Sequence, residues 1–174
     1  VEKALEGLPM GAEVLEVGAG SGCVAISLKL ERPDLRVAAL DVSADALVVA
    51  RQNAAELGAA VDFIQGDAFG DEWITVPDQS LGLIVSNPPY VPLEDEPGLE
   101  PELTFEPALA LFVENGPGRF VERLGLIGCR LLKRGGRLMI ETHAPDANAS
   151  LDYLREQGYR DSHTLEDLSR RPRV

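Results

Sequence analysis

Three glycines at alternating positions, Gly18, Gly20 and Gly22, follow directly on an apolar segment and constrain the fold of this chain more than any other feature. The preceding residues 13–18 have the composition of a buried strand, and residues 22–31 are predicted to form a helix. Because glycine lacks a Cβ atom, the backbone between the two elements can turn sharply and approach a ligand closely. A strand, a glycine turn and a helix in this order predict the beginning of a βαβ unit.

The alternation of apolar strands and helices continues along the chain. Ser43 offers an N-cap and Gly58 a C-terminal stop for a further helix. Strands that alternate with helices pair in parallel, so we expect an α/β fold with a mostly parallel seven-stranded sheet and helices on both faces, in a single domain over residues 1–174. Ligands of such sheets bind at the carboxyl ends of the strands. The further predicted strands are 35–41, 61–64, 81–86, 137–141 and 159–164 with a seventh near the end of the chain, and the further predicted helices are 118–132 and 146–157.

The charge balance limits the partners that we expect. Lys and Arg number 16 against 29 Asp and Glu among the 174 residues, which gives a formal net charge of −13. Nucleic acids and anionic membranes attract basic surfaces, so neither is expected as a direct partner. The sequence shows no apolar stretch long enough to span a bilayer and no signal peptide, so we expect a cytoplasmic protein, and we expect it to be a monomer.

The two cysteines and two histidines provide little material for a metal centre. Cys23 and Cys129 lie far apart in the sequence and belong to no Cys-x-x-Cys pair, so neither a disulfide framework nor a zinc module is expected. We therefore predict no metal site. Cys23 is expected to pack behind the glycine turn, and Cys129 is expected to be a core residue of a helix.

The spacing of the glycines indicates which ligand the turn binds. In the dinucleotide fingerprint Gly-x-Gly-x-x-Gly, the third glycine would stand at position 23, which is a cysteine here. The pattern acidic-x-Gly-x-Gly-x-Gly that starts at Glu16 instead resembles the loop with which class I methyltransferases cradle the methionine part of S-adenosylmethionine. The residues of this loop expected at the cofactor are Gly18, Ala19, Gly20, Ser21 and Gly22.

Two further acids follow predicted strands, where they can hold the nucleoside part of that cofactor. Asp41 ends the second strand, and its carboxylate can accept hydrogen bonds from both ribose hydroxyls; the alternative is a charge that stabilises the N-terminus of the next helix. Asp67 follows the third strand, where it can accept from the adenine amino group while the next backbone N–H, at Ala68, meets the ring. The alternative for Asp67 is a turn residue after Gly66.

The segment Asn87-Pro88-Pro89-Tyr90 ends the fourth predicted strand and is the most specific motif of the chain. The prolines fix their own φ angles and favour an extended Asn87. The side-chain oxygen of Asn87 and the carbonyl of Pro88 can each accept one hydrogen of a planar –NH₂ group, while Tyr90 can stack on its conjugated plane. Because these acceptors favour charge build-up on an attacking nitrogen, we predict Asn87, Pro88 and Tyr90 as catalytic and all four residues as substrate-binding.

Together the motifs resemble those of the HemK/PrmC family of release factor glutamine methyltransferases, over about residues 12–174. The resemblance implies a Rossmann-like class I methyltransferase fold. It also implies methyl transfer from S-adenosyl-L-methionine to N5 of the glutamine in the Gly-Gly-Gln motif of a peptide chain release factor, with S-adenosyl-L-homocysteine as product. By resemblance, Gly18–Gly22, Asp41, Ala68 and Asn87 line the cofactor site, and Asn87–Tyr90 bind the glutamine. The small helical N-terminal domain of the family is not found in these 174 residues.

Two other functions stay open at the level of sequence. Asn-Pro-Pro motifs also serve enzymes that methylate an exocyclic amino group of a base in RNA or DNA after base flipping, although the net charge argues against that substrate. A domain that only binds the cofactor or a protein partner is the second alternative, against which the intact motif argues. Residues 91–107, rich in Pro and acids, are predicted to form either a solvated loop or a lid over the cleft.

Overall fold

The computed structural model describes residues 1–89, 91–92, 112–113, 118–142, 144–166 and 171–174. The chain forms two compact units. The first unit consists of Val1–Ser86 and Ile127–Met139, and the second consists of Asn87–Leu126 and Ile140–Val174.

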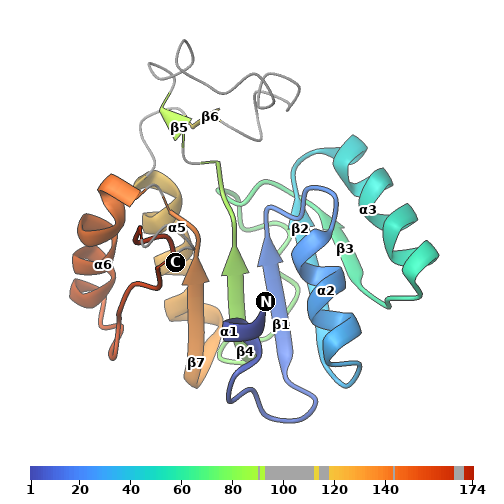
Figure 1. Cartoon of the computed structure of the whole chain (residues 1–174), viewed down its shortest axis with the longest axis horizontal. Helices are drawn as coiled ribbons and strands as arrows, with labels where there is room; N and C mark the ends of the chain where they lie inside the picture. Colours follow the sequence, from blue (N-terminus) through green and yellow to red (C-terminus); the bar gives the residue numbers. More distant parts are fainter. Residues whose placement is uncertain (90, 93–111, 114–117, 143, 167–170) are drawn as a thin grey trace. The chain divides into compact units, whose positions relative to one another are not determined.

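A five-stranded sheet in the order β3-β2-β1-β4-β7 forms the centre of the first unit (Figure 1). The central strand β1 pairs in parallel with β2 and with β4, and β2 pairs in parallel with β3. This pairing brings the carboxyl ends of the four strands to one edge of the sheet, which the glycine turn and Asp67 follow. The strands are β1 (Glu13–Val17), β2 (Arg36–Asp41), β3 (Asp62–Gln65), β4 (Leu81–Ser86) and β7 (Leu132–Ile140).

The ends of helix α3 are set by local sequence signals. At its start, Ser43 Oγ accepts a hydrogen bond from the N–H of Ala46 at 3.2 Å. At its end, Gly58 has a φ of +70°, and its N–H reaches the carbonyls of Ala54 and Ala55. Both predicted caps are therefore confirmed. The helices that precede and connect the first strands are α1 (Glu2–Leu5), α2 (Cys23–Glu31) and α3 (Ala44–Leu57).

Apolar side chains from the sheet and the helices form the core of the first unit. Leu28 of α2, Leu47 of α3 and Leu83 of β4 are all 0% exposed. On β1, the neighbours Val14 and Leu15 are both buried. Because consecutive residues of a strand point to opposite faces, both faces of β1 are covered, as expected for a parallel sheet.

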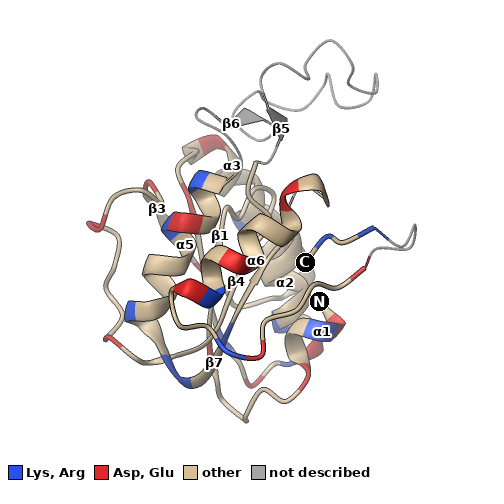
Figure 2. Cartoon of the chain, turned by 90° about the vertical axis from the view of Figure 1, so that its left-hand side faces the viewer, with Lys and Arg blue, Asp and Glu red and all other residues tan. Residues whose placement is uncertain are grey.

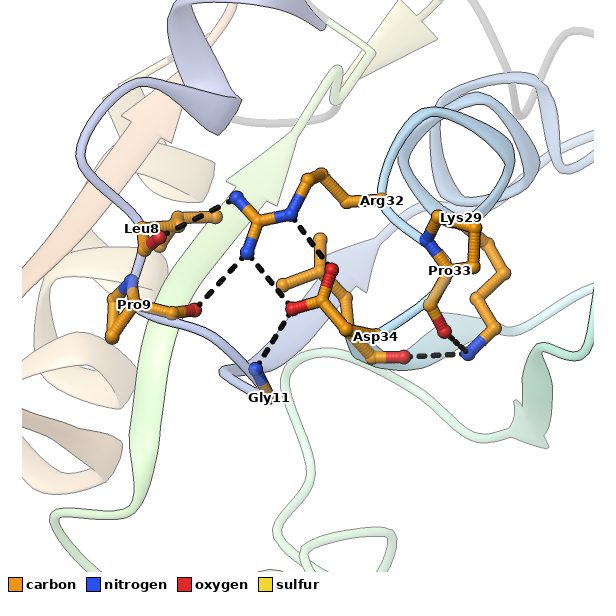
Figure 3. A network of polar contacts seen from close by, with 8 residues as sticks. Leu8, Pro9, Gly11, Lys29, Arg32, Pro33 and Asp34 are labelled. Atoms are coloured by element: carbon orange, nitrogen blue, oxygen red, sulfur yellow. Dashed lines mark hydrogen bonds and ion pairs between the residues drawn. The ribbon is translucent and has the colours of Figure 1, made fainter.

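A charged network ties together two turns at the amino ends of β1 and β2 (Figure 3). Arg32 donates through Nε and Nη2 to the two carboxylate oxygens of Asp34, at 2.7 and 2.8 Å. Asp34 also accepts from the N–H of Gly11 at 2.8 Å, and the Arg32 guanidinium reaches the carbonyls of Leu8 and Pro9 at 3.4 Å. The hydrogen bonds from Arg32, and then that from Gly11, lower the pKa of Asp34 below its ordinary value.

In the second unit, helices α5 (Gly118–Leu131, whose last residues belong to the first unit) and α6 (Ala147–Glu156) meet at a glycine. A Cβ atom on Gly125 of α5 would lie 3.1 Å from Leu154 Cδ2, and the Gly125 carbonyl accepts from the Tyr159 hydroxyl at 2.9 Å. Both signs of charge occur on α5 and α6 in Figure 2. The remaining elements are the short parallel strands β5 (Val91–Pro92) and β6 (Phe112–Val113) and the 3₁₀ helix η3 (Ala144–Asp146).

The predicted α/β fold with a parallel sheet is confirmed, but among the described residues the sheet has five strands and not seven. Residues 159–164 form no strand. Asp161 has a φ of +57°, and the carbonyl of Ser162 accepts from Arg155 of α6, so this segment turns instead of extending. The end of the chain adds an isolated antiparallel bridge between Glu166 and Pro172.

The start of β7 also differs from its prediction. The strand begins at Leu132 and not at Arg137, so it contains Gly135 and Gly136. A Cβ atom on Gly136 would lie 2.9 Å from the carbonyl oxygen of Leu81 in β4, which explains why glycine stands inside this strand. Because these glycines interrupt the apolar pattern, that pattern alone does not predict the beginning of β7.

Candidate functional site

The glycine turn after β1 contains residues that only glycine fits comfortably. Gly18, Gly20 and Gly22 have φ angles of +82°, +52° and +83°, in the left-handed region. A Cβ atom on Gly22 would lie 2.9 Å from Ile26 Cδ1 and 3.2 Å from Ala50 Cβ, so this glycine lets α2 and α3 pack closely. Gly18 and Gly20 are exposed, and a Cβ on Gly20 would meet nothing within 4 Å. The turn therefore presents exposed backbone on a packed base.

Hydrogen bonds tether this turn to its neighbours. The N–H groups of Gly18 and Ala19 donate to the carbonyl of Leu40 in β2, at 2.8 and 2.9 Å. The carbonyl of Ser21 accepts from the side-chain amide of Asn53 in α3 at 3.0 Å. Ala19 is buried and Ser21 is exposed. Asn53, which no sequence motif singles out, holds the turn from the side of α3.

Asp41 connects three loops at this edge of the sheet. Its Oδ2 accepts from the N–H of Gly20 and its Oδ1 from the N–H of Ser43, both at 2.8 Å. Its backbone carbonyl accepts from the N–H of Gly66 at 3.0 Å. Each carboxylate oxygen has a second lone pair, so the half-buried side chain can accept further hydrogen bonds from a ligand.

Glu16 is a buried carboxyl group behind the glycine turn, to which the sequence analysis assigned no role. It is 2% exposed, and its Oε2 accepts from the N–H of Ala25 in the first turn of α2 at 2.9 Å. Burial raises the pKa of Glu16 from 4.5 to about 8, the hydrogen bond from Ala25 opposes the rise, and the charge of Asp41 adds to it. An acid among the apolar residues of β1 is the sequence signal for this site.

The turn after β3 is organised around Asp67. Its Oδ1 accepts from the N–H of Phe69 and its carbonyl from the N–H of Gly70, both at 2.9 Å. Asp67 is therefore a turn residue, and its side chain is also exposed. Ala68 is half-buried in the same turn. Trp73, which the sequence analysis did not single out, donates its indole N–H to Gly70 at 3.0 Å.

The first unit ends where the Asn-Pro-Pro motif begins. Ser86 closes β4, is buried, and donates its hydroxyl to the carbonyl of Val17 in β1 at 2.7 Å. In the second unit, Asn87 is exposed, Pro88 is buried and Pro89 is half-buried. Tyr90 lies outside the described residues, as does the segment 93–107 of the predicted acidic loop. The roles of these four residues stay predictions.

Two acids at the carboxyl ends of the strands, Asp41 and Asp67, carry charge that no cation of the protein compensates. Among the described residues, no Lys or Arg forms an ion pair with either of them. The partners given above for their carboxyl oxygens are backbone N–H groups. This edge of the sheet is consequently suited to a ligand with positive charge and hydroxyl or amino donors.

The structure corrects one expectation about the cysteines. Cys23 and Cys129 are both exposed rather than packed in the core. Within the part of the chain that the structure describes, no three His, Cys, Asp or Glu side chains gather as a metal site. Over those same residues, no helix is both long enough and apolar enough to cross a membrane.

The chain is similar to known proteins both in sequence and in fold. A family model described as "Methyltransferase small domain" matches residues 3–121. Proteins named release factor glutamine methyltransferase from Bacteroides thetaiotaomicron and Neisseria gonorrhoeae are each 38% identical, over 95% and 100% of this chain and over 60% and 63% of their own lengths. One from Bordetella pertussis is 41% identical over 97% of this chain and 62% of its own length.

Solved structures of other methyltransferases share the fold. A SAM-dependent methyltransferase from Aquifex aeolicus has a TM-score of 0.61 and 22% identity, over 95% of this chain and 82% of its own. A ribosomal protein L11 methylase from Lactobacillus delbrueckii has a TM-score of 0.62 and 18% identity, over 95% of this chain and 68% of its own. At sequence identities this low, the similarity of these structures to the chain shows a shared fold only. This chain spans about 60% of the length of the curated relatives.

Proposed function

This chain belongs to the methyltransferase small domain family, and we propose that it transfers a methyl group from S-adenosylmethionine to the side-chain amide nitrogen of a glutamine in a peptide chain release factor. The observation that carries the proposal is the set of relatives of that name, about 38% identical over nearly the whole chain. The motif Asn87-Pro88-Pro89-Tyr90, which suits a planar –NH₂ substrate, supports it.

The edge formed by the carboxyl ends of the strands fits the proposed cofactor. When bound, S-adenosylmethionine supplies an electrophilic methyl group on a positively charged sulfur. The two oxygens of Asp41, already oriented by Gly20 and Ser43, would accept the ribose hydroxyls. The exposed backbone of the glycine turn would face the methionine part, and Asp67 with Ala68 would face the adenine. The absence of ion pairs to these acids in the described residues supports binding of a cation.

Asn87 and Pro88 would act on the nitrogen that receives the methyl group. The lone pair of an amide nitrogen is delocalised into the carbonyl, so the nitrogen is a weak nucleophile. Hydrogen bonds from its two hydrogens to the Asn87 side-chain oxygen and the Pro88 carbonyl would favour positive charge on the nitrogen as the new N–C bond forms and the S–C bond of the sulfonium breaks. The methylated nitrogen would then release one proton to solvent. Tyr90 would hold the amide plane by stacking, which orients the nitrogen toward the methyl group.

The proposal is tested with labelled S-adenosylmethionine and the purified chain. Three substrates are compared: a release factor with an intact Gly-Gly-Gln motif, the same factor with that glutamine changed to alanine, and total RNA and DNA. We expect label on the intact factor alone. Label on nucleic acid would move the assignment to methylation of a base amino group.

The variant Asn87→Ala separates catalysis from cofactor binding. We expect methyl transfer to the release factor to fall about 100-fold or more, since a group that stabilises the transition state is removed. The affinity for S-adenosylhomocysteine, measured by calorimetry, should change less than about threefold, because the acids that hold the nucleoside are intact. A chain that only binds would show label on no substrate, and this substitution would change nothing that it does.

A further inference from the structure

Trp73 closes the turn that follows β3, and it is the single tryptophan of the chain. Its side chain is 6% exposed, and its indole N–H donates to the carbonyl of Gly70 at 3.0 Å. At the other end of the turn, a Cβ atom on Gly66 would lie 2.8 Å from Trp73 Cβ and 3.1 Å from Leu40 Cδ1. One buried side chain therefore meets both ends of the segment Gly66–Gly70.

The residues between these two ends are held in a fixed turn. Asp67 accepts from Phe69 through its carboxylate and from Gly70 through its carbonyl. Gly66 donates its N–H to the carbonyl of Asp41 at 3.0 Å, so the start of the turn is joined to the end of β2. Whatever fixes the turn Gly66–Gly70 thus also fixes the place of the Asp67 carboxylate relative to Asp41.

We propose that Trp73 is a positioning residue for recognition of the base, which holds the turn Gly66–Gly70 so that Asp67 and the backbone after it can read the amino edge of adenine. The inference rests on the proposed function. The contacts of Trp73 given above are with the turn, so it would act through Asp67. Hydrogen bonds read a base only when donor and acceptor are aligned, and a loosened turn loses discrimination before it loses all affinity.

The test compares two ligands that differ at the base. S-adenosylhomocysteine has the 6-amino group of adenine, and S-inosylhomocysteine has an oxygen in its place. The ratio of their dissociation constants, measured by calorimetry, reports base discrimination separately from total affinity. In the unmodified chain we expect a ratio of about tenfold or more, because the analogue leaves the Asp67 acceptor without its donor.

The ratio of dissociation constants is then measured in two Trp73 variants and in a matched control. Trp73→Leu should bring the ratio down to about twofold, near the value of Asp67→Ala. Trp73→Phe keeps a ring against Gly66 but removes the N–H, so it should lower the ratio by about two- to threefold, which corresponds to the loss of one weak neutral hydrogen bond. Leu35→Ala is the control: Leu35 is 0% exposed and precedes β2 at the opposite edge of the sheet. It should lower the melting temperature and leave the ratio unchanged.

The outcomes separate the inference from the function on which it rests. An unchanged ratio in both Trp73 variants overturns the inference and leaves the proposed function standing. Equal loss of the ratio in Leu35→Ala overturns it too, since general destabilisation would then explain the result. If the unmodified chain binds neither ligand, the proposed function fails and the inference fails with it. Should Trp73→Leu not fold, the ratio in Trp73→Phe decides.

Discussion

At the carboxyl ends of the strands, Asp41 accepts hydrogen bonds from the backbone N–H groups of Gly20 and Ser43. At the amino ends, Asp34 is held by the guanidinium of Arg32 as well as by the N–H of Gly11. Both carboxylates tie loops together over similar distances, but Asp34 has its charge compensated within the network. The difference indicates that Asp41 remains an anion that a ligand can use. Asp34, by contrast, is a structural brace whose charge is already paired with Arg32.

Removal of the two carboxylates should therefore have opposite consequences for ligand binding. Asp41→Ala is expected to weaken binding of S-adenosylhomocysteine about 100-fold or more, because hydrogen bonds to a charged acceptor contribute about 1.5–3 kcal/mol each. Asp34→Ala should change that affinity less than about twofold, since the brace lies at the far ends of the strands. Calorimetric titration of both variants checks the contrast. Similar losses in the two would contradict it.

The buried Glu16 should make the stability of the fold depend on pH. Its pKa in the fold is raised from 4.5 to about 8, so the folded chain holds a proton that the unfolded chain has released between these values. Stability should then fall as pH rises from about 4.5 to about 8, at up to about 1.4 kcal/mol for each pH unit. Glu16→Gln retains an acceptor for Ala25 and cannot ionise. Its melting temperature should exceed that of the unmodified chain at pH 8, with a smaller difference at pH 5, and a constant difference would contradict the assignment.

Asp34 should show the reverse dependence, with a smaller amplitude. Its pKa is lowered from 3.8, so its stabilising effect is complete above that value and is lost as pH falls through the lower pKa of the folded state. Asp34→Asn should lower the melting temperature by a few degrees at pH 7, because Arg32 loses its charged partner. The gap between variant and unmodified chain should narrow in strongly acidic solution. Thermal melts at neutral and acidic pH decide whether it does.

The part of the fold that rests on local signals could be predicted from sequence. Helix α3 begins after Ser43 and ends at Gly58 as expected, because an N-cap hydroxyl and a left-handed glycine act within a few residues of themselves. The strand β4 covers the predicted residues 81–86, since a strand buried on both faces is apolar throughout. By contrast, residues 159–164 have a strand-like composition but form hydrogen bonds with residues of α6 and α5. Their conformation is therefore set by tertiary contacts and not by local sequence.

The candidate site divides in the same way. The spacing of Gly18, Gly20 and Gly22 predicts a turn, and their φ angles in the left-handed region confirm that the turn favours glycine. The burial of Glu16 and the closure of the Asp67 turn by Trp73 depend on what packs against them from other elements. Sequence periodicity carries no information about such contacts between distant segments, so neither could be inferred from it.

The three bonds of Asp41 have a thermodynamic consequence. Its side chain holds the glycine turn and the start of α3, and its carbonyl holds the turn of Asp67. A ligand fragment that orders one of these loops lowers the entropy that the next fragment must remove from the others. Methionine and adenosine offered separately should therefore bind with positive cooperativity, and each should raise the affinity for the other by the same factor.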